Sequence, residues 1–360
     1  MKIIHCADLH LDSKMETNLS KEQAKERKNE ILLTFERMVE YAKENDVKII
    51  IIAGDMFDKK QITQKAKNIV KNTIYSSPEI DFIYLRGNHD EAGFIEEDEK
   101  VPENLKMFND FSWKTYPYGD ITITGIEFGN QDRYELYNSL NLDKSKINIV
   151  VMHGQESETD VKDKAEIISL KQLKNKNIDY LALGHIHSFK QEKLDNRGIY
   201  CYSGCLEGRG FDECGEKGFV LLNIEDGKIN SKFIPFATRS FYEINVDLTG
   251  ITENNSVEAK IEENIKDIPS SSLVKIVLGG EAEIGEERDI DYLTKKFEHK
   301  FYFLKIKDKP KRKLDFMKYQ NDKSLKGEFI RLVLSQDDLT EDEKSKIINT
   351  GIKALSGEEI

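Results

Sequence analysis

Apolar and polar positions in the first part of the chain predict strands that alternate with helices. Four consecutive isoleucines at 49–52 form a run that is too short to span a membrane and is typical of a strand buried on both faces. Between residues 20 and 45, apolar side chains recur at spacings of one, three and four, which predicts a helix with one buried stripe. A second helix over 63–76 and a strand over 80–85 follow. This order favours parallel strands joined by right-handed crossovers.

The middle of the chain predicts further strands. Residues 116–128 alternate with period two, and apolar strands at 147–152 and 178–183 enclose a short helix at 166–174. Short β segments then fill 188–236, with an Asp-Gly hairpin turn at 226–227. We expect these last segments to form a second, antiparallel sheet that closes against the first.

The remaining residues predict two smaller parts, so the chain divides into 1–236, 237–310 and 311–360. The second part has the order β-α-β-α-β, as in a small α+β domain. The run KIKDKPKRK at 305–313 holds six basic residues and one acidic residue, and is either a solvated linker or a patch that contacts phosphate or a partner. Amphipathic helices at 324–334 and 340–355 could fold back on the core or form a docking surface for another chain.

Composition narrows the class of protein. The chain has 360 residues and a net charge of −12, which argues against indiscriminate polyanion binding but permits a local basic groove. We see no membrane span and no signal peptide, so we expect a cytoplasmic protein. The four cysteines lack paired CxxC spacing, which favours free thiols over a zinc site.

Five predicted strands end in side chains that bind metals. In chain order, the first of these strands is followed by Asp8 and His10, the second by Asp55, the third by Asn88, the fourth by His153, and the fifth by His185 and His187. One of them alone could be an ordinary turn residue, but five of the seven histidines in the chain lie at such ends, His89 included. Three oxygen and four nitrogen donors fit two octahedral ions that share a carboxylate, and Asp55, after the central strand, is the natural bridge.

The donor set also indicates the metal and the reaction. Mixed oxygen and nitrogen donors suit manganese or iron better than magnesium, and we expect two Mn²⁺ ions. Two divalent ions about 3.5 to 4 Å apart lower the pKa of a water molecule and neutralise phosphorus oxygens, so they serve phosphoester hydrolysis.

Three further residues are candidates for other roles. His89 is expected to act as the general acid toward the leaving oxygen, with Asp90 orienting its ring; the alternative for His89 is an electrostatic contact to phosphate only. Arg209 is expected either to contact phosphate or to form a surface salt bridge. His5 lies within the first strand, and we expect it to be packed in the core.

The order DLH, GDMFD, GNHD, MHG and GHIH resembles the calcineurin-like metallophosphoesterase superfamily over residues 1–236. Within it, ADLHLDS, AGDMFD, LRGNHD and YSGCLEGRGFDECGEKGFVLLNI resemble the bacterial DNA repair exonucleases of the SbcD and YhaO type. The resemblance implies an α/β fold: a two-sheet αββα sandwich with a smaller α+β cap domain and C-terminal helices.

The resemblance also implies a function and partners. Asp8, His10, Asp55 and His187 would hold one manganese ion, and Asp55, Asn88, His153 and His185 the other. The protein would be a DNA exonuclease, with endonuclease activity as an addition, whose C-terminal helices dock on an SMC-like ABC ATPase; we also expect a homodimer. The alternatives are a phosphodiesterase for small or cyclic nucleotides, and a subunit that mainly recruits an ATPase.

Overall fold

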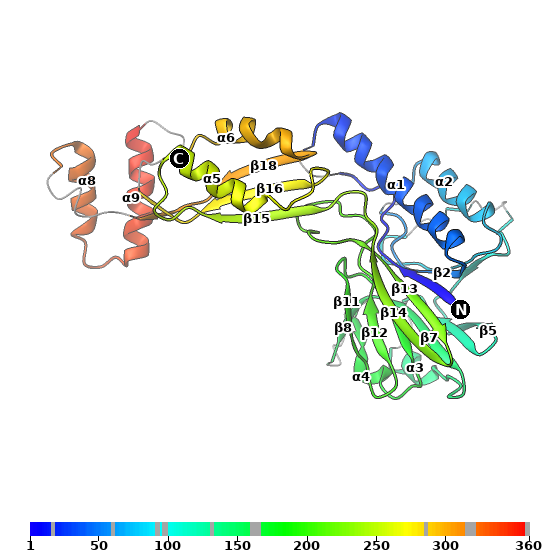
Figure 1. The fold of residues 1–360 in the computed structure, drawn as a ribbon. Helices are drawn as coiled ribbons and strands as arrows, with labels where there is room; N and C mark the ends of the chain where they lie inside the picture. Colours follow the sequence, from blue (N-terminus) through cyan, green and yellow to red (C-terminus); the bar gives the residue numbers. More distant parts are fainter. Residues whose placement is uncertain are drawn as a thin grey trace. The chain divides into compact units, whose positions relative to one another are not determined.

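The computed structural model describes residues 1–15, 19–58, 62–90, 94–95, 100–129, 133–158, 167–283, 287–313 and 322–356. It separates into two compact units, Met1–Ser240 and Phe241–Ile360 (Figure 1). The two units are described in turn.

The first sheet is built around the N-terminal strand. Among the described residues it has the order β14-β13-β1-β2-β3-β4. Four strands are parallel: β1 (Lys2–Cys6), β2 (Val47–Ala53), β3 (Asp81–Leu85) and β4 (Leu105–Met107). The hairpin of β13 (Gly218–Glu225) and β14 (Lys228–Pro235) adds to β1 in antiparallel fashion.

Two helices connect the parallel strands, as the apolar spacing predicts. Helix α1 (Lys21–Glu44) begins after Ser20, which forms a capping box with Gln23, and α2 (Gln64–Tyr75) begins after the N-cap Thr63. Both predicted helices are confirmed to within one residue at each end.

The second sheet has the order β11-β12-β10-β7-β6-β5. Its members are β5 (Lys114–Tyr118), β6 (Ile121–Gly125), β7 (Ile147–His153), β10 (Tyr180–Gly184), β11 (Lys190–Lys193) and β12 (Ile199–Tyr202). Strands β6, β7, β10 and β12 run parallel, so this sheet is largely parallel rather than antiparallel. The expectation that 188–236 forms a sheet of its own is therefore wrong: β11 and β12 complete the second sheet, whereas β13 and β14 complete the first.

The region between β6 and β10 also differs from the expectation. Helix α3 (Arg133–Ser139) was not predicted, and the helix predicted over 166–174 is confined to α4 (Leu170–Leu173). The residues before it form β9 (Ile167–Ser169), which pairs with β8 (Gln155–Ser157).

Three apolar clusters show that the first unit is the predicted αββα sandwich. One cluster packs α1 and α2 on the outer face of the first sheet, through residues such as Phe35, Ile50 and Phe82. A second cluster fills the space between the two sheets, and a third covers the outer face of the second sheet beneath α3 and α4. His5 is fully buried between the sheets, where its Nδ1 lies 2.9 Å from Tyr180 Oη, so the core assignment is confirmed.

The second unit contains a three-stranded parallel sheet in the order β15-β16-β18. Its elements are β15 (Phe241–Asp247), α5 (Asn254–Ile265), β16 (Leu273–Gly279), α6 (Ile290–Phe297), the 3-10 turn η1 (Glu298–Lys300) and β18 (Phe303–Asp308). Tyr292 and Lys296 of α6 both bond Glu258 of α5, so the two helices cover the same face of the sheet.

The basic run at 305–313 is not a linker. Its first residues belong to β18, and β19 (Lys311–Lys313) pairs in parallel with β17 (Glu281–Glu283). The alternation within β18 buries Leu304 and Ile306 under the helices and places Lys305 and Lys307 on the other face.

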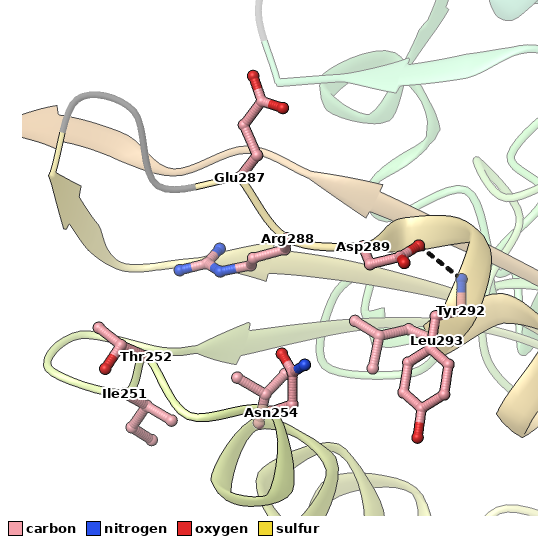
Figure 2. A pocket seen from close by; sticks show the side chains of 9 residues that line it. Ile251, Thr252, Asn254, Glu287, Arg288, Asp289, Tyr292 and Leu293 are labelled. Atoms are coloured by element: carbon pink, nitrogen blue, oxygen red, sulfur yellow. Dashed lines mark hydrogen bonds between the residues drawn. The ribbon is translucent and has the colours of Figure 1, made fainter.

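A pocket of about 230 Å³ lies beside the N-terminal ends of α5 and α6 in this unit (Figure 2). Its lining includes Thr252, Asn254 and Tyr292. Arg288, which also lines it, is paired with Asp308 at 2.6 Å.

The C-terminal helices α8 (Leu325–Leu334) and α9 (Glu341–Ser356) pack on each other through Ile330, Val333, Ile348 and Ile352. Leu332 stays largely exposed, as do Leu325, Ile347 and Leu355. In the part of the chain that the structure describes, no helix combines the length and apolar character that crossing a membrane requires.

Candidate metal centre

The predicted ligands lie at the carboxyl ends of strands from both sheets. Asp8, Asp55 and Asn88 follow β1, β2 and β3 of the first sheet, whereas His153 ends β7 and His185 follows β10 of the second. The two sheet edges are joined at this point, because the His185 N–H donates to Asp8 Oδ1 at 2.9 Å. The site is thus built between two sheets, not along the rim of one.

Several ligand residues adopt the left-handed backbone region, which side chains other than glycine rarely occupy. The φ angles are 51° at Asp8, 43° at His10, 52° at Asp55 and 102° at His185. These conformations turn the chain sharply off each strand, and backbone bonds such as His10 N to Asp55 O, 2.9 Å, hold the turns together. Strain of this kind persists only where the surroundings enforce it, and it is concentrated at functional sites.

The first donor group consists of Asp8, His10 and His187, whose ligand atoms lie within 4.8 Å of one another. His10 Nε2 and His187 Nε2 face each other at 3.2 Å. Asp55 Oδ2 lies 3.9 Å from His10 Nε2, at the edge of this group.

The second donor group consists of Asp8, Asp55 and His153. His153 Nε2 lies 3.3 Å from Asp55 Oδ2 and 3.0 Å from Asn88 Oδ1. The predicted ligand His185 lies outside both groups, although its ring meets the edge of the His153 ring with centroids 5.4 Å apart. Asp8 belongs to both donor groups, and Asp55 Oδ2 lies near one histidine of each, so the bridging role of Asp55 stays a prediction.

The chemistry of these donors fits cations. The His153 Nδ1–H donates to the Ala53 carbonyl at 2.9 Å, so in the neutral ring Nε2 presents a lone pair toward the amide oxygen of Asn88. Asp8 and Asp55 are 1% and 2% exposed, and two buried carboxylates side by side require compensating positive charge. The residues present therefore fit a pair of divalent metal ions.

The pKa shifts in the site also reflect the buried carboxylates and their attraction for positive charge. Burial raises the pKa of Asp8 above its usual range. Burial alone would lower the pKa of His153, but the contact with the Asp55 carboxylate and the charges of Asp55 and Asp8 outweigh it and raise this pKa to about 9. The site attracts positive charge strongly enough to protonate one of its own histidines.

His89 lies at the open side of the site, with 47% of its side chain exposed. Its backbone N–H donates to Asp55 Oδ1 at 3.0 Å, and its ring packs edge-on against His10 with centroids 5.3 Å apart. The carboxylate that faces its Nδ1 is that of Asp58, 3.6 Å away, which is beyond hydrogen-bond distance.

The expectation that Asp90 orients His89 is wrong. Asp90 is buried, and its carboxylate accepts hydrogen bonds from the backbone N–H groups of Met56, Phe57 and Gly87. It therefore ties the turn after β2 to the turn after β3. The adjacency of His89 and Asp90 in the sequence suggested a contact that the tight turn prevents.

Arg209 lies beside the first donor group, where its guanidinium is bound by Glu213 instead of forming an isolated surface pair. Glu213 also lies 2.7 Å from His187 Nδ1. Burial would raise the pKa of Glu213, but hydrogen bonds from His187 and Arg209 outweigh it and lower the pKa to about 2.

Sequence reasoning missed two residues here, Asp58 and Glu213. A signal existed for each: Asp58 ends the GDMFD motif, and Glu213 follows Arg209 by four residues in GRGFDE.

Comparison with known proteins gives consistent results. The family model for calcineurin-like phosphoesterase matches residues 1–189. An uncharacterized metallophosphoesterase, YhaO of Bacillus subtilis (strain 168), is 26% identical over 296 residues, which cover 78% of this chain and 72% of the relative.

Two solved structures are also similar. The crystal structure of TT1561 of Thermus thermophilus has a TM-score of 0.41 and 14% identity, and the match covers 64% of this chain and 98% of the other. A dimetal phosphatase from Danio rerio has a TM-score of 0.41 and 8% identity, with 64% of this chain and 95% of the other covered.

The matched family hydrolyses phosphoesters at a two-metal centre, and the described donors supply candidate ligand groups for such a centre. Since the match spans more than half of its 360 residues, this chain belongs to the calcineurin-like phosphoesterase family.

Proposed function

We propose that this protein is a manganese-dependent DNA exonuclease, with endonuclease activity in addition, that acts in DNA repair. The observation that carries the proposal is the pair of adjacent donor groups that share Asp8, with Asp55 of the second group 3.9 Å from His10 of the first. Asp8, His10, Asp55 and His187 would hold one ion, and Asp55, Asn88, His153 and His185 the other. When bound, such ions lower the pKa of a water molecule and offset charge on the phosphorus oxygens.

His89 supplies the proton for the leaving oxygen in this proposal. Its Nδ1 faces Asp58, which leaves Nε2 as the nitrogen that donates to the substrate. The bond from its own backbone N–H to Asp55 Oδ1 ties the His89 main chain to a predicted metal ligand.

Two features support DNA as the substrate. The similarity of residues 202–224 to the repair nucleases extends beyond the family match. The second unit also carries Lys305, Lys307 and Lys309 along one strand and its exit, where they could neutralise phosphates locally although the net charge of the chain is −12.

The test measures cleavage of linear duplex and single-stranded DNA with Mn²⁺, alongside hydrolysis of bis-p-nitrophenyl phosphate. Asp55→Ala should abolish both reactions. His89→Ala should slow DNA cleavage by about 10²- to 10⁴-fold. It should affect bis-p-nitrophenyl phosphate far less, because nitrophenolate leaves without a proton. Full DNA cleavage by either variant would contradict the proposal.

A phosphodiesterase for small or cyclic nucleotides is the second candidate, and the net charge of −12 favours it. A competition assay distinguishes the two candidate functions. If cyclic nucleotides inhibit bis-p-nitrophenyl phosphate turnover and DNA does not, the small-substrate function is correct.

We also propose that α8 and α9 dock on a partner, an SMC-like ABC ATPase. Leu325 and Leu332 lie seven residues apart on one face of α8 and are exposed, as are Ile347 and Leu355 on α9. Deletion of 324–360 should abolish binding to the ATPase while hydrolysis of the model substrate continues. Retained binding would contradict this role.

A further inference from the structure

The loop between β12 and β13 places an acidic side chain against a predicted metal ligand. Glu213 in this loop is 5% exposed, and its Oε1 lies 2.7 Å from His187 Nδ1. This carboxylate lies closer to Nδ1 than Arg209 Nη2 does, at 2.7 Å against 3.3 Å, so it accepts the Nδ1–H and the neutral ring keeps its lone pair on Nε2. Nε2 is the atom that faces His10 Nε2 within the first donor group.

Arg209 holds Glu213 in place. Its backbone N–H donates to Glu213 Oε2 at 2.7 Å, and its guanidinium donates to Oε1 at 2.8 Å from Nη2 and 3.2 Å from Nε. Both carboxylate oxygens are therefore occupied by the same arginine, which fixes the plane of the acceptor that His187 meets.

The same arginine reaches the other histidine of the first donor group through a second carboxylate. Arg209 Nη1 lies 3.4 Å from Asp58 Oδ1, and that oxygen lies 3.1 Å from His10 Nδ1. His187 Nδ1 is therefore hydrogen-bonded to its carboxylate, whereas the contact of His10 Nδ1 with Asp58 lacks hydrogen-bond geometry, and Arg209 contacts both carboxylates.

The loop also fixes the backbone at His187. Lys217, which is 3% exposed, donates from Nζ to the His187 carbonyl at 2.8 Å. The Cys205 N–H donates to the same carbonyl at 3.4 Å. The loop between β12 and β13 therefore contacts both the ring and the main chain of His187.

We propose that Glu213, clamped by Arg209, is a positioning residue that sets the tautomer and orientation of His187 and so the metal affinity of the first donor group. This inference rests on the proposed two-metal function. Both residues lie beyond the family match at 1–189, so the metal centre depends on a part of the chain that the family model does not include. Loss of such an outer carboxylate typically weakens metal binding by about 10- to 100-fold.

The first test determines the tautomer in the metal-free wild-type protein, and a variant serves only to assign the signal. Nitrogen-15 NMR of the histidine rings at pH 9, with His187 assigned by His187→Gln, should show the proton on Nδ1. A proton on Nε2 would overturn the inference.

The second test measures Mn²⁺ binding to the full chain by calorimetry. Glu213→Ala should weaken one of two sites by about 10- to 100-fold and leave the other unchanged, while His187 becomes a mixture of tautomers. Glu213→Gln retains an acceptor and should give a smaller loss. Glu216→Ala removes the same charge from an exposed position of the same loop and should match the wild type.

The outcomes separate the two proposals. If both sites of Glu213→Ala and Glu213→Gln match the wild type, the positioning role is wrong and the proposed two-metal function stands. If the wild type binds no Mn²⁺, the two-metal function itself fails.

Discussion

Gly87 gives the Asp55 carboxylate the space it occupies. A Cβ at position 87 would lie 2.1 Å from Asp55 Oδ1 and 2.6 Å from the Asp55 backbone nitrogen, closer than atoms can approach. The glycine that precedes Asn88 is therefore required by the close approach of two ligand turns, apart from any effect on its own backbone.

Replacing this glycine should impair activity more than folding. Gly87→Ala should lower kcat/KM for bis-p-nitrophenyl phosphate by about 100-fold, because displacing a catalytic group by 1 Å has an effect of this size. Gly227→Ala is the control: at φ 74°, with no atom within 4 Å of the new Cβ, it should cost about 1 kcal/mol of stability and leave activity unchanged. Wild-type activity in Gly87→Ala would show that the turn can relax.

The buried side chain of His5 should make the free energy of unfolding decrease as the pH drops. Burial lowers its pKa to about 3, whereas the unfolded chain binds a proton at this residue near pH 6.5. Between these values the unfolded state binds more protons, so the free energy of unfolding falls by about 1.4 kcal/mol per pH unit as the pH drops. Urea unfolding of wild type and His5→Gln should give curves that diverge below pH 6.5; parallel curves would contradict the assignment.

At the scale of elements, the sequence was sufficient to locate the longer strands and helices, but not α3 or the short strands, and not to assign strands to sheets. The isoleucines of β2 indicate that both faces of this strand are buried. A strand in the other sheet would be buried in the same way, so burial does not show which sheet a strand belongs to. His153 ends β7 and His185 follows β10, as predicted, but both strands belong to the second sheet, where they pair with β6 and β12. Pairing depends on contacts far apart in sequence, which periodicity does not report.

At the candidate site, too, local sequence patterns predict some features, whereas contacts between distant residues are seen only in the structure. Motif spacing was sufficient to predict candidate donors at the strand ends, and five of them fall in the two donor groups, whereas His185 lies outside both. The contact from Glu213 to His187 spans 26 residues and requires the loop after β12 to fold back on the site, and Asp90 turns toward Met56 and Phe57 instead of its neighbour in the chain. Short elements such as β4, with three residues, carry too little pattern to be recognised.

Helix α1 should depend on a buried ion pair. Arg27 is fully buried and donates to Glu207 at 3.0 Å, and Thr34 donates to the other oxygen of Glu207 at 2.8 Å. Glu207→Ala should lower the free energy of unfolding by about 1–3 kcal/mol, because it removes a buried acceptor of Arg27 and Thr34 while Glu30 and the Gly208 carbonyl still bind the guanidinium. Arg27→Met combined with Glu207→Leu should recover much of this loss in denaturant unfolding; an equal loss in single and double variants would exclude the charge as the cause.

At the scale of the whole molecule, every predicted metal ligand belongs to the first compact unit. A protein ending at Ser240 should therefore hydrolyse bis-p-nitrophenyl phosphate at close to the wild-type rate. It should lose DNA cleavage, because the lysines of β18 and its exit are removed. Parallel assays of the two substrates test this, and undiminished DNA cleavage would show that the second unit does not contribute to substrate binding.

The position of β1 in the interior of its sheet has a consequence for synthesis on the ribosome. β1, which Asp8 and His10 follow, is synthesised long before one of its two neighbours, β13, whose residues begin at Gly218. A nascent chain that ends at 189 would leave this strand with an open hydrogen-bonding edge, and a translation pause before residue 225 would extend the time in which that edge can pair with another polypeptide.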